Sequence, residues 1–572
     1  MNILDQQPKF AGPKIRITRR PSTNAITSLN TIPPLLQRLY AARGITSPTD
    51  LELNLKQLLP PSNLGGITTA VELLATAIIK QQRIAITGDY DTDGATASTL
   101  CLLVLQALGA KYCKIFIPNR FTMGYGLAPE LVEQTSDWGA QLIITVDSGV
   151  SSFEGVERAR TLGINIIVTD HHLPGTNLPN ANAIINPNLP GELFSAKNTA
   201  GVGVAFYLMS ALRRHLMPQF NMASLLDLVA LGTVADLVPL DLNNRIFVQA
   251  GLLLIRSRRC RPGILALLKT AGREPNTATA QDLGFSVAPR LNAAGRLASM
   301  DLGVSCLLET NTEQALNLAQ ELHDINLDRR NIEQQMDDEA EIILDTSYAN
   351  NTMPFGLCMY NERWHQGVIG ILASRLRERY HRPAIVLAAN DDGIIQGSAR
   401  SIPAVHIRDL LVSINNKYPN LLIRFGGHAM AAGLSLHAEQ IDNFTQIFDQ
   451  ELRRHLNNQL PQAELLTDGQ LSDNEITAET ARLLRYAGPW GQGFPTPMFD
   501  GEFRVCKQRI LKNAHLKLVL ETETKTKVDA IFFRWGTQML DYDIVRAVYN
   551  LDLNSYGGQE NPQFILEYLE PA

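Results

Sequence analysis

Seven acidic and imidazole side chains, spread over four short stretches of the chain, could together bind metal ions and move protons. They are Asp89, Asp91, Asp93, Asp147, His171, His172 and Asp236. The first three stand at alternate positions, so in an extended segment they would project from one side and repel one another unless cations held them. Hard oxygen ligands with a single imidazole suit Mn²⁺ or Mg²⁺ better than Zn²⁺. The pattern therefore predicts a site for hard divalent cations.

The number of these ligands exceeds what one ion needs. This predicts two divalent cations, about 3.5–4 Å apart as in phosphoryl-transfer sites. Such a pair lowers the pKa of a bridging water and binds the oxygens of an in-line displacement. His172 stands beside the predicted ligand His171 and could donate a hydrogen bond or a proton to the phosphate or to the leaving oxygen.

Taken alone, the run from Asp89 to Asp93 is also typical of a solvated acidic turn or of the start of a calcium loop. The calcium interpretation is weakened because residues 95–102 contain no glutamate where an EF-hand loop needs one. The solvated turn stays open for this motif alone. It is disfavoured by the other stretches, because successive strands that all end in metal-type ligands are uncommon.

The elements that would position these residues alternate between strand and helix. Buried β-rich runs are expected at 83–88, 113–117, 141–146 and 164–169, and helical patterns at 95–109, 127–137 and 151–162. This order predicts a parallel sheet with helices on both faces. The carboxyl ends of such strands line one crevice. Asp89, Asp147 and His171 each follow a predicted strand, and Asp236 follows an apolar helical run, so they can meet although they lie far apart in the sequence.

Beyond the first sheet, the sequence predicts three further parts. Apolar residues at three- and four-residue spacing over 312–344, with no Gly or Pro, predict one long helix that connects two lobes, with a coiled-coil dimer as the alternative. A second α/β pattern runs from a strand at 355–359 to a helix at 438–456. Short strands at 502–506, 516–520, 528–533 and 544–548 predict a small β-barrel or sandwich.

Composition limits the classes of protein that fit. The 51 basic and 57 acidic residues give a net charge of −6, which argues against a polycationic coat but leaves local nucleic-acid-binding patches possible. Apolar residues make up 45% of the 572, enough for sizeable cores in about three or four domains. No apolar run reaches the roughly 18 residues of a spanning helix, and the first residues lack a signal-peptide pattern. Six cysteines without a Cys-x-x-Cys pair predict reduced thiols in a cytosolic protein.

Several motifs, in this order between residues 88 and 492, together resemble a known family. They are 88–94 (GDYDTDG), 146–149 (VDSG), 170–172 (DHH), 288–296 (APRLNAAGR), 365–370 (HQGVIG), 397–401 (GSARS), 425–433 (FGGHAMAAG) and 488–492 (GPWGQ). The first three resemble the signatures of the DHH phosphoesterase superfamily, and 425–433 resembles the glycine-rich motif of its associated second domain. As a set they resemble the RecJ family of bacterial single-strand-specific exonucleases.

The resemblance implies an α/β fold in which a parallel-sheet DHH domain and a second α/β domain, DHHA1, are joined by a long helix and followed by an OB-fold-like β-barrel. The expected bounds are 1–65 for an N-terminal extension, 66–245 for the DHH domain, 246–350 for a helical connector that includes the long helix, 351–457 for the DHHA1 substrate-binding domain, and 458–572 for the OB-like domain.

The resemblance also implies roles for single residues. Two Mn²⁺ or Mg²⁺ ions would be held by Asp89, Asp91, Asp93, Asp147, His171 and Asp236, with Asp147 bridging the ions. His172 would be the catalytic histidine. The substrate-binding residues would be Arg120, Tyr125, Arg290, Asn292, Ser398, Arg400 and His428. Of these, Arg120 would lie near the 5′ end and Tyr125 would be a stacking aromatic. The basic stretch Arg504, Lys507, Arg509, Lys512 and Lys517 would suit a barrel that binds single strands.

The function implied is that of a metal-dependent exodeoxyribonuclease that degrades single-stranded DNA processively in the 5′→3′ direction and releases mononucleotides during recombination and repair. The strand would thread between two lobes through a passage too narrow for duplex. The resemblance further implies a cytoplasmic monomer that works with single-strand-binding protein and a helicase. Two alternatives stay open: a phosphatase or small-nucleotide phosphodiesterase of the same superfamily, and a non-catalytic single-strand-binding protein.

Overall fold

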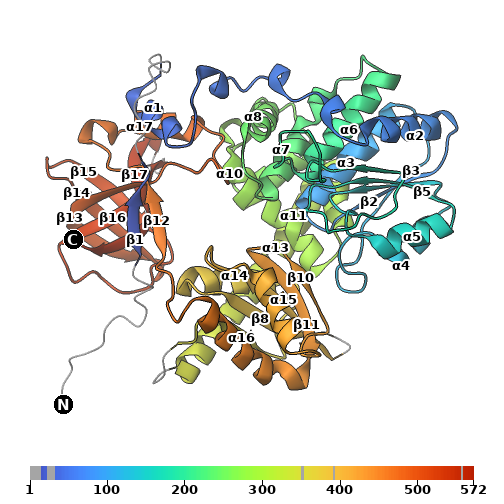
Figure 1. The fold of residues 1–572 in the computed structure, drawn as a ribbon. Coiled ribbons are helices and arrows are strands. Elements are labelled where there is room, and N and C mark those ends of the chain that lie inside the picture. The colour runs from blue at the N-terminus through green and yellow to red at the C-terminus, as the bar shows by residue number, and fades with distance from the viewer. Residues whose placement is uncertain (1–14, 22–31, 349–352, 391–392, 555–557) are drawn as a thin grey trace. The chain divides into compact units, whose positions relative to one another are not determined.

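The computed structural model describes residues 15–21, 32–348, 353–390, 393–554 and 558–572 (Figure 1). These residues form two compact units. One comprises Arg19–Asn326 with Thr467–Ala572, and the other comprises Leu327–Leu466 with the segment that ends at Thr18. The boundary at residue 326 falls inside helix α13 (Thr312–Tyr348), which has 37 residues. The prediction of one long helix over 312–344 is therefore confirmed.

The larger unit contains a five-stranded parallel sheet with the strand order β3-β2-β4-β5-β6. The strands are β2 (Ile84–Gly88), β3 (Cys113–Phe116), β4 (Leu142–Val146), β5 (Asn165–Thr169) and β6 (Ala183–Ile185). The first four agree with the predicted runs to within a residue. β6 was not predicted, because only three residues form it.

Helices cover both faces of this sheet, as expected for strands that are apolar throughout. On one face, α2 (Ile67–Ile79), α3 (Thr92–Ala107) and α6 (Gly201–Leu216) pack against Ile84, Ile86 and Ile144. On the other face, α4 (Pro129–Asp137) and α5 (Phe153–Thr161) pack against Ala85 and Ile143. Because successive side chains along each β-strand point to opposite faces of the sheet, every strand contributes residues to both cores.

A set of further helices extends the first of these cores. They are α1 (Pro34–Ala41), α7 (Leu226–Ala235), α8 (Leu242–Arg256), α9 (Pro262–Thr270), α10 (Ala280–Asp282), α11 (Ala288–Leu297) and α12 (Asp301–Leu308). The side chains of Leu35, Leu36 and Leu39 in α1 are buried there, so this helix of the N-terminal segment packs into the core of the larger unit. A π-helical segment, Leu283–Val287, leads directly into α11.

The same unit ends in a closed barrel with the strand order β13-β14-β15-β17-β16. The strands are β13 (Phe499–Leu511), β14 (His515–Glu521), β15 (Lys527–Phe532), β16 (Ile544–Asn554) and β17 (Asn561–Pro571). The predicted barrel is confirmed. The sequence missed β17, whose antiparallel pairing with β16 and parallel pairing with β15 close the barrel. Helix α17 (Ala478–Tyr486) precedes the barrel.

The smaller unit contains a second five-stranded sheet with the order β10-β11-β9-β8-β7. Its strands are β7 (Leu357–Tyr360), β8 (Ala384–Ala389), β9 (Ile394–Arg400), β10 (Arg424–Gly427) and β11 (Ala431–His437). Helices α14 (Ile369–Tyr380), α15 (Ile407–Lys417) and α16 (Ile441–His455) complete it. The hairpin of β10 and β11 was not predicted, because the glycines of the 425–433 motif hide the strand pattern.

Two features tie segments distant in sequence together. Strand β1 (Arg16–Arg19) pairs with β12 (Glu464–Thr467). Within the smaller unit, the buried carboxylates of Glu333 and Asp337 on α13 form ion pairs with Arg375 on α14, and Asp337 also pairs with Arg379. Loss of Arg375 would remove one of the two arginines that pair with each carboxylate, because Arg329 also pairs with Glu333. Weakening buried ion pairs is costly, so these pairs fix α14 against α13.

All six cysteines are free, as the sequence predicted. Within the described ranges, no single helix is long and apolar enough to cross a membrane. One bent pair, Leu55–Asn63 with Ile67–Ile79, passes by length and composition, with 85° between its members. Its second member is α2, which packs into the core of the larger unit.

Candidate metal centre

The acidic motif after β2 does not stay extended, so its three carboxylates do not project from one side as they would in an extended segment. Helix α3 begins at Thr92, and Asp91 caps it by accepting a hydrogen bond from the Gly94 amide on Oδ1 at 3.0 Å. Asp93 therefore lies in the first turn of the helix. Its two oxygens accept the amide hydrogens of Gly201 and Val202 at 2.7 and 2.9 Å. Asp93 thus ties the start of α3 to the start of α6.

Asp147 follows β4 directly and adopts a left-handed backbone conformation with φ of +59°. Gly201 makes room for it, because a Cβ on that glycine would lie 2.5 Å from Asp147 Oδ1. Left-handed residues other than glycine are uncommon and collect at functional sites. The turn aims the carboxylate across the ends of the strands.

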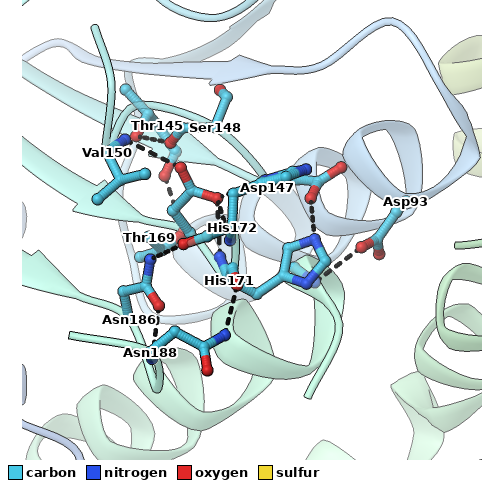
Figure 2. A network of polar contacts seen from close by, with 12 residues as sticks. Asp93, Thr145, Asp147, Ser148, Val150, Thr169, His171, His172, Asn186 and Asn188 are labelled. Carbon is cyan, nitrogen blue, oxygen red and sulfur yellow. Dashed lines mark hydrogen bonds and ion pairs between the residues drawn. The ribbon is translucent and has the colours of Figure 1, made fainter. Parts of the chain in front are cut away.

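His171 follows β5 and completes the centre (Figure 2). Its Nε2 lies 3.1 Å from Asp147 Oδ1 and 3.4 Å from Oδ2 of Asp236, the residue that ends α7. Ligand atoms within 4.8 Å of one another form three groups: Asp89, Asp91 and Asp147; Asp93, His171 and Asp236; and Asp147, His171 and His172. All seven residues singled out from the sequence therefore come together.

The electrostatics of the centre fit cations. Burial, together with the neighbouring carboxylates, raises the pKa of Asp89, Asp147 and Asp236 well above its ordinary value and that of Asp93 to about 7. Buried oxygens of Asp89, Asp147 and Asp236 accept no hydrogen bond within the described residues. Crowded carboxylates whose ionised forms lack donors are stabilised by bound divalent ions. The residues present therefore fit the two predicted cations.

The sequence gives Asp170 no role beyond its place in the Asp-His-His motif, but the structure gives it a distinct one. Its Oδ1 accepts hydrogen bonds from the amides of His171 and His172 and lies 2.8 Å from His172 Nδ1, and its Oδ2 accepts the Val150 amide. Burial alone would raise the pKa of Asp170, but the hydrogen bond and charge of His172 outweigh it and lower the pKa. An ionised Asp170 directs Nδ1–H of His172 toward itself and leaves Nε2 for other partners.

Two asparagines after β6 also contribute to the centre, although the sequence did not predict a role for them. Asn186 Nδ2 donates to the carbonyl oxygen of His172 at 2.8 Å, and Asn188 Nδ2 donates to that of His171 at 2.6 Å. Both stand just after a strand, as the predicted ligands do. Their position after a strand could have indicated a role in the centre, but the short β6 was not predicted as a strand.

Aromatic and basic side chains flank the centre. The guanidinium of Arg120 lies 4.7 Å from the centroid of the Tyr90 ring, which in turn contacts Tyr125 edge to face. The ring of Tyr125 packs edge to face on His172, and its hydroxyl points inward to within 3.1 Å of Asp147 O and of His172 Nδ1. The predicted stacking residue is thus part of the framework of the centre as well.

Comparisons with known proteins bear on this geometry. Three family models match: the N-terminal domain of the DHH family over residues 83–233, the DHHA1 domain over 347–454 and the RecJ OB domain over 467–568. The chain is 50% identical to the single-stranded-DNA-specific exonuclease RecJ of Salmonella typhimurium over 94% of this chain and 96% of that protein. It is 48% identical to the Escherichia coli protein of the same name, over 98% and 99% of the two chains.

This chain belongs to the RecJ family. The fold agrees, because the crystal structure of RecJ in complex with Mn²⁺ from Thermus thermophilus matches with a TM-score of 0.81 at 27% identity, over 97% of this chain and 79% of that one. DHH, DHHA1 and OB-type parts are all present, as the sequence predicted.

Two of the residues expected to contact the DNA strand in this RecJ family member lie on α11. Arg290 is 9% exposed, donates to the carbonyl oxygen of Ser286 and has its Nε 3.1 Å from Nδ1 of His323. Asn292 accepts hydrogen bonds on Oδ1 from both the amide and the hydroxyl of Thr92, each at 2.8 Å. Both side chains are therefore engaged in packing the helix onto its surroundings.

Three other residues expected to contact the DNA strand lie in the smaller unit. Arg400 and Ser398 both stand on β9, and Arg400 Nη1 donates to Ser398 Oγ at 3.1 Å. His428 is exposed in the turn between β10 and β11, where its amide donates to the Ala431 carbonyl. Ala431 is paired with Arg400 across the sheet, so all three residues share one end of it. Gly370 of α14 lies against Ser398 and Arg400, with no room for a Cβ there without displacement.

Proposed function

We propose that this protein is an exonuclease specific for single-stranded DNA, which hydrolyses phosphodiester bonds in the 5′→3′ direction with two divalent cations and releases mononucleotides. The observation that carries the proposal is the gathering of five aspartates and two histidines around one point at the carboxyl ends of β2, β4 and β5. Relatives that match over nearly the whole chain are named as exonucleases with this specificity.

The cations would be held by two groups of ligands. Asp89 and Asp91 would bind one ion, Asp93, His171 and Asp236 would bind the other, and Asp147 would bridge them. When bound, Mn²⁺ or Mg²⁺ would lower the pKa of a water and neutralise the charge that develops on the phosphate. A related structure contains Mn²⁺, and a second one contains Mg²⁺.

His172 is the residue that would move a proton. Burial alone would lower its pKa, but the hydrogen bond to Asp170 and the surrounding carboxylates outweigh burial and raise it. The charged imidazole is therefore stabilised, and its Nε2 would donate to a phosphate oxygen or to the leaving oxygen. Asp170 would keep the ring oriented, as its geometry with Nδ1 requires.

The remaining residues would bind the strand. We propose that Arg120 lies near the 5′ end, that Tyr125 stacks on a base, and that Ser398, Arg400 and His428 bind phosphates. Arginine suits this role because its planar fork matches phosphate oxygens. Within the larger unit, Arg290 on α11 would also contact a phosphate of the DNA strand. Asn292 on the same helix, which the family resemblance likewise gives to the DNA strand, accepts hydrogen bonds from Thr92. The basic stretch of β13 and β14, from Arg504 to Lys517, would bind the strand further along.

Some features of the proposal rest on the family alone. They are action in recombination and repair, cooperation with single-strand-binding protein and a helicase, a monomeric state, and a cytoplasmic location. The proposed division into domains, at 1–65, 66–245, 246–350, 351–457 and 458–572, likewise follows the family.

Asp147 offers the sharpest test. The variant Asp147→Asn keeps the shape of the side chain, and asparagine tolerates the left-handed backbone at this position. With Mn²⁺ and strands labelled at either end, the parent protein should release labelled mononucleotides from the 5′ label first. The variant should lose about a thousandfold or more in rate, because a bridging carboxylate is lost, yet bind the strand with nearly unchanged affinity.

Two outcomes would contradict the proposal. If Asp147→Asn degraded the DNA strand with metal as fast as the parent does, the candidate metal centre would not be the site of hydrolysis. Activity of the parent confined to oligonucleotides of two to five residues would instead assign a phosphodiesterase for small substrates.

A further inference from the structure

Helix α11 contacts the acidic motif of the metal centre at two consecutive turns. Asn292 Oδ1 accepts hydrogen bonds from the amide and the hydroxyl of Thr92, which stands between Asp91 and Asp93. The same hydroxyl lies 3.3 Å from the carbonyl oxygen of Ala288, one turn earlier on α11. Three residues further on, Gly295 faces the motif so closely that a Cβ there would lie 1.9 Å from the carbonyl oxygen of Tyr90. The segment from Tyr90 to Thr92 is therefore held by a helix about two hundred positions away in sequence.

The hydrogen bonds to Asn292 satisfy groups that the motif cannot satisfy itself. The amide of Thr92 is the first of α3, and amides in the first turn of a helix have no partner within the helix. The Thr92 side chain is 1% exposed, so no bulk water can replace the bond. Because the amide of Thr92 must donate, the atom of Asn292 that faces it is the carbonyl oxygen and not the amide nitrogen.

We infer that Asn292 is a positioning residue of the metal centre, which holds Asp91 and Asp93 in the geometry that binds the cations. The inference rests on the proposed use of divalent cations. The family resemblance makes Asn292 a contact to the DNA strand. The inference instead gives its Oδ1 the role of holding the metal ligands. Groups that orient metal ligands influence affinity strongly, and their loss typically weakens metal binding by about ten- to a hundredfold.

The acidic motif needs such support. Asp89 and Asp93 are buried close to Asp91, so the three carboxylates repel one another when they are ionised, which favours a rearrangement that would separate them. Asp91 already uses one oxygen to cap α3. If Thr92 lost its anchor, the cap and the first helical turn could shift, and both flanking ligands would move together.

The test is calorimetric titration of the metal-free full-length protein with Mn²⁺ in the absence of DNA. Asn292→Leu keeps the size of the side chain but removes the acceptor, and we expect its dissociation constant for Mn²⁺ to rise about tenfold. Thr92→Val removes only the hydroxyl bond, so a smaller rise of about threefold is expected, and Thr92→Ser should match the parent. Asn317→Leu, at an exposed position on α13, is the matched control and should also bind as the parent does.

Steady-state kinetics at saturating Mn²⁺ separate this role from a strand contact. For Asn292→Leu, a positioning role predicts a KM for the strand within about twofold of the parent once the metal sites are filled. Unchanged Mn²⁺ affinity with a raised KM would make Asn292 a strand contact and overturn the inference. If Asn292→Leu does not fold, equal Mn²⁺ affinities for Thr92→Val and Thr92→Ser would overturn it. Failure of the parent itself to bind Mn²⁺ would overturn the proposed function as well.

Discussion

The hydroxyl of Tyr125 lies 3.1 Å from the backbone carbonyl oxygen of Asp147, so a side chain expected to stack on substrate is joined to the backbone of a central ligand. The same hydroxyl lies 3.1 Å from His172 Nδ1. Because Asp170 takes the hydrogen on that nitrogen, the hydrogen of the phenol is directed to Asp147. Tyr125 therefore stabilises the left-handed turn that aims the Asp147 carboxylate.

Replacing Tyr125 with phenylalanine isolates this bond from stacking. Tyr125→Phe keeps the ring, so an aromatic that only stacks on a base should tolerate the change without loss. We expect instead that kcat falls about three- to tenfold, which corresponds to the loss of one neutral hydrogen bond. Rates measured on a single-stranded substrate at saturating Mn²⁺ check this. A kcat equal to that of the parent would show that the hydroxyl is dispensable and leave stacking as the role of Tyr125.

Asp170→Asn should separate the orientation of His172 from metal binding. Asn presents an acceptor to only one side, so either the three donors at Oδ1 or the Val150 amide at Oδ2 would face an NH₂ group. We expect kcat to fall about a hundredfold or more through the loss of an oriented proton donor, and the melting temperature to fall as well.

The control for this variant is Asp345→Asn, at an exposed position near the end of α13. It removes one charge without removing a buried partner, and it should leave both kcat and the melting temperature unchanged. If Asp170→Asn kept the full rate with a normal melting temperature, the orienting role of Asp170 would be wrong.

Much of the centre was predictable, because strand ends meet at one edge of a parallel sheet whatever the rest of the fold does. Asp147 and His171 follow β4 and β5 as expected, and these strands are neighbours. The apolar runs that form the strands carry enough information to place these two residues. Asp236 was found as well, although its position depends on the packing of α7 and not on a strand.

The connections made by single side chains could not be predicted in the same way. Asp93 would project beside Asp89 and Asp91 only in an extended segment, but it lies in the first turn of α3, and its oxygens accept the first amides of α6. Asn292 and Thr92 are joined by a pair of hydrogen bonds across the fold. Such contacts depend on how whole helices pack, and no local pattern in the sequence reports them.

Gly201→Ala should damage the centre without removing any ligand. The added Cβ would lie 2.5 Å from Asp147 Oδ1 and 2.6 Å from its Cβ, so Asp147 would have to move. Overpacking of this kind typically destabilises a buried site by about 1–3 kcal/mol. We expect weaker Mn²⁺ binding and a rate at least about tenfold lower.

Gly175→Ala is the matched control for this glycine. Its nearest neighbour would be the Asn177 carbonyl oxygen at 3.9 Å, and its backbone needs no left-handed conformation. It should behave as the parent does in the same nuclease and Mn²⁺-binding measurements. Normal Mn²⁺ affinity in Gly201→Ala would mean that the close approach to Asp147 is not needed for the metal centre.

Removal of the metal should affect stability in a way that depends on pH. The pKa of Asp93 is raised to about 7, and the pKa values of Asp89, Asp147 and Asp236 are raised too, so the folded metal-free chain keeps protons that the unfolded chain releases near pH 4. Between these values the folded state binds more protons than the unfolded state. The contribution of these four carboxylates to the stability of the metal-free protein therefore falls as the pH rises from about 4 through about 7.

Bound cations should reverse this loss, because they take the place of the protons on the carboxylates. We expect Mn²⁺ to raise the melting temperature only slightly at pH 5 and by several degrees at pH 7.5, since protons compete with the metal at the lower pH. Thermal melts of the chelator-treated protein, with and without Mn²⁺ at both pH values, measure the difference. The variant Asp147→Asn should show a smaller gain at pH 7.5. A gain from Mn²⁺ that is the same at both pH values would contradict the raised pKa values of the cluster.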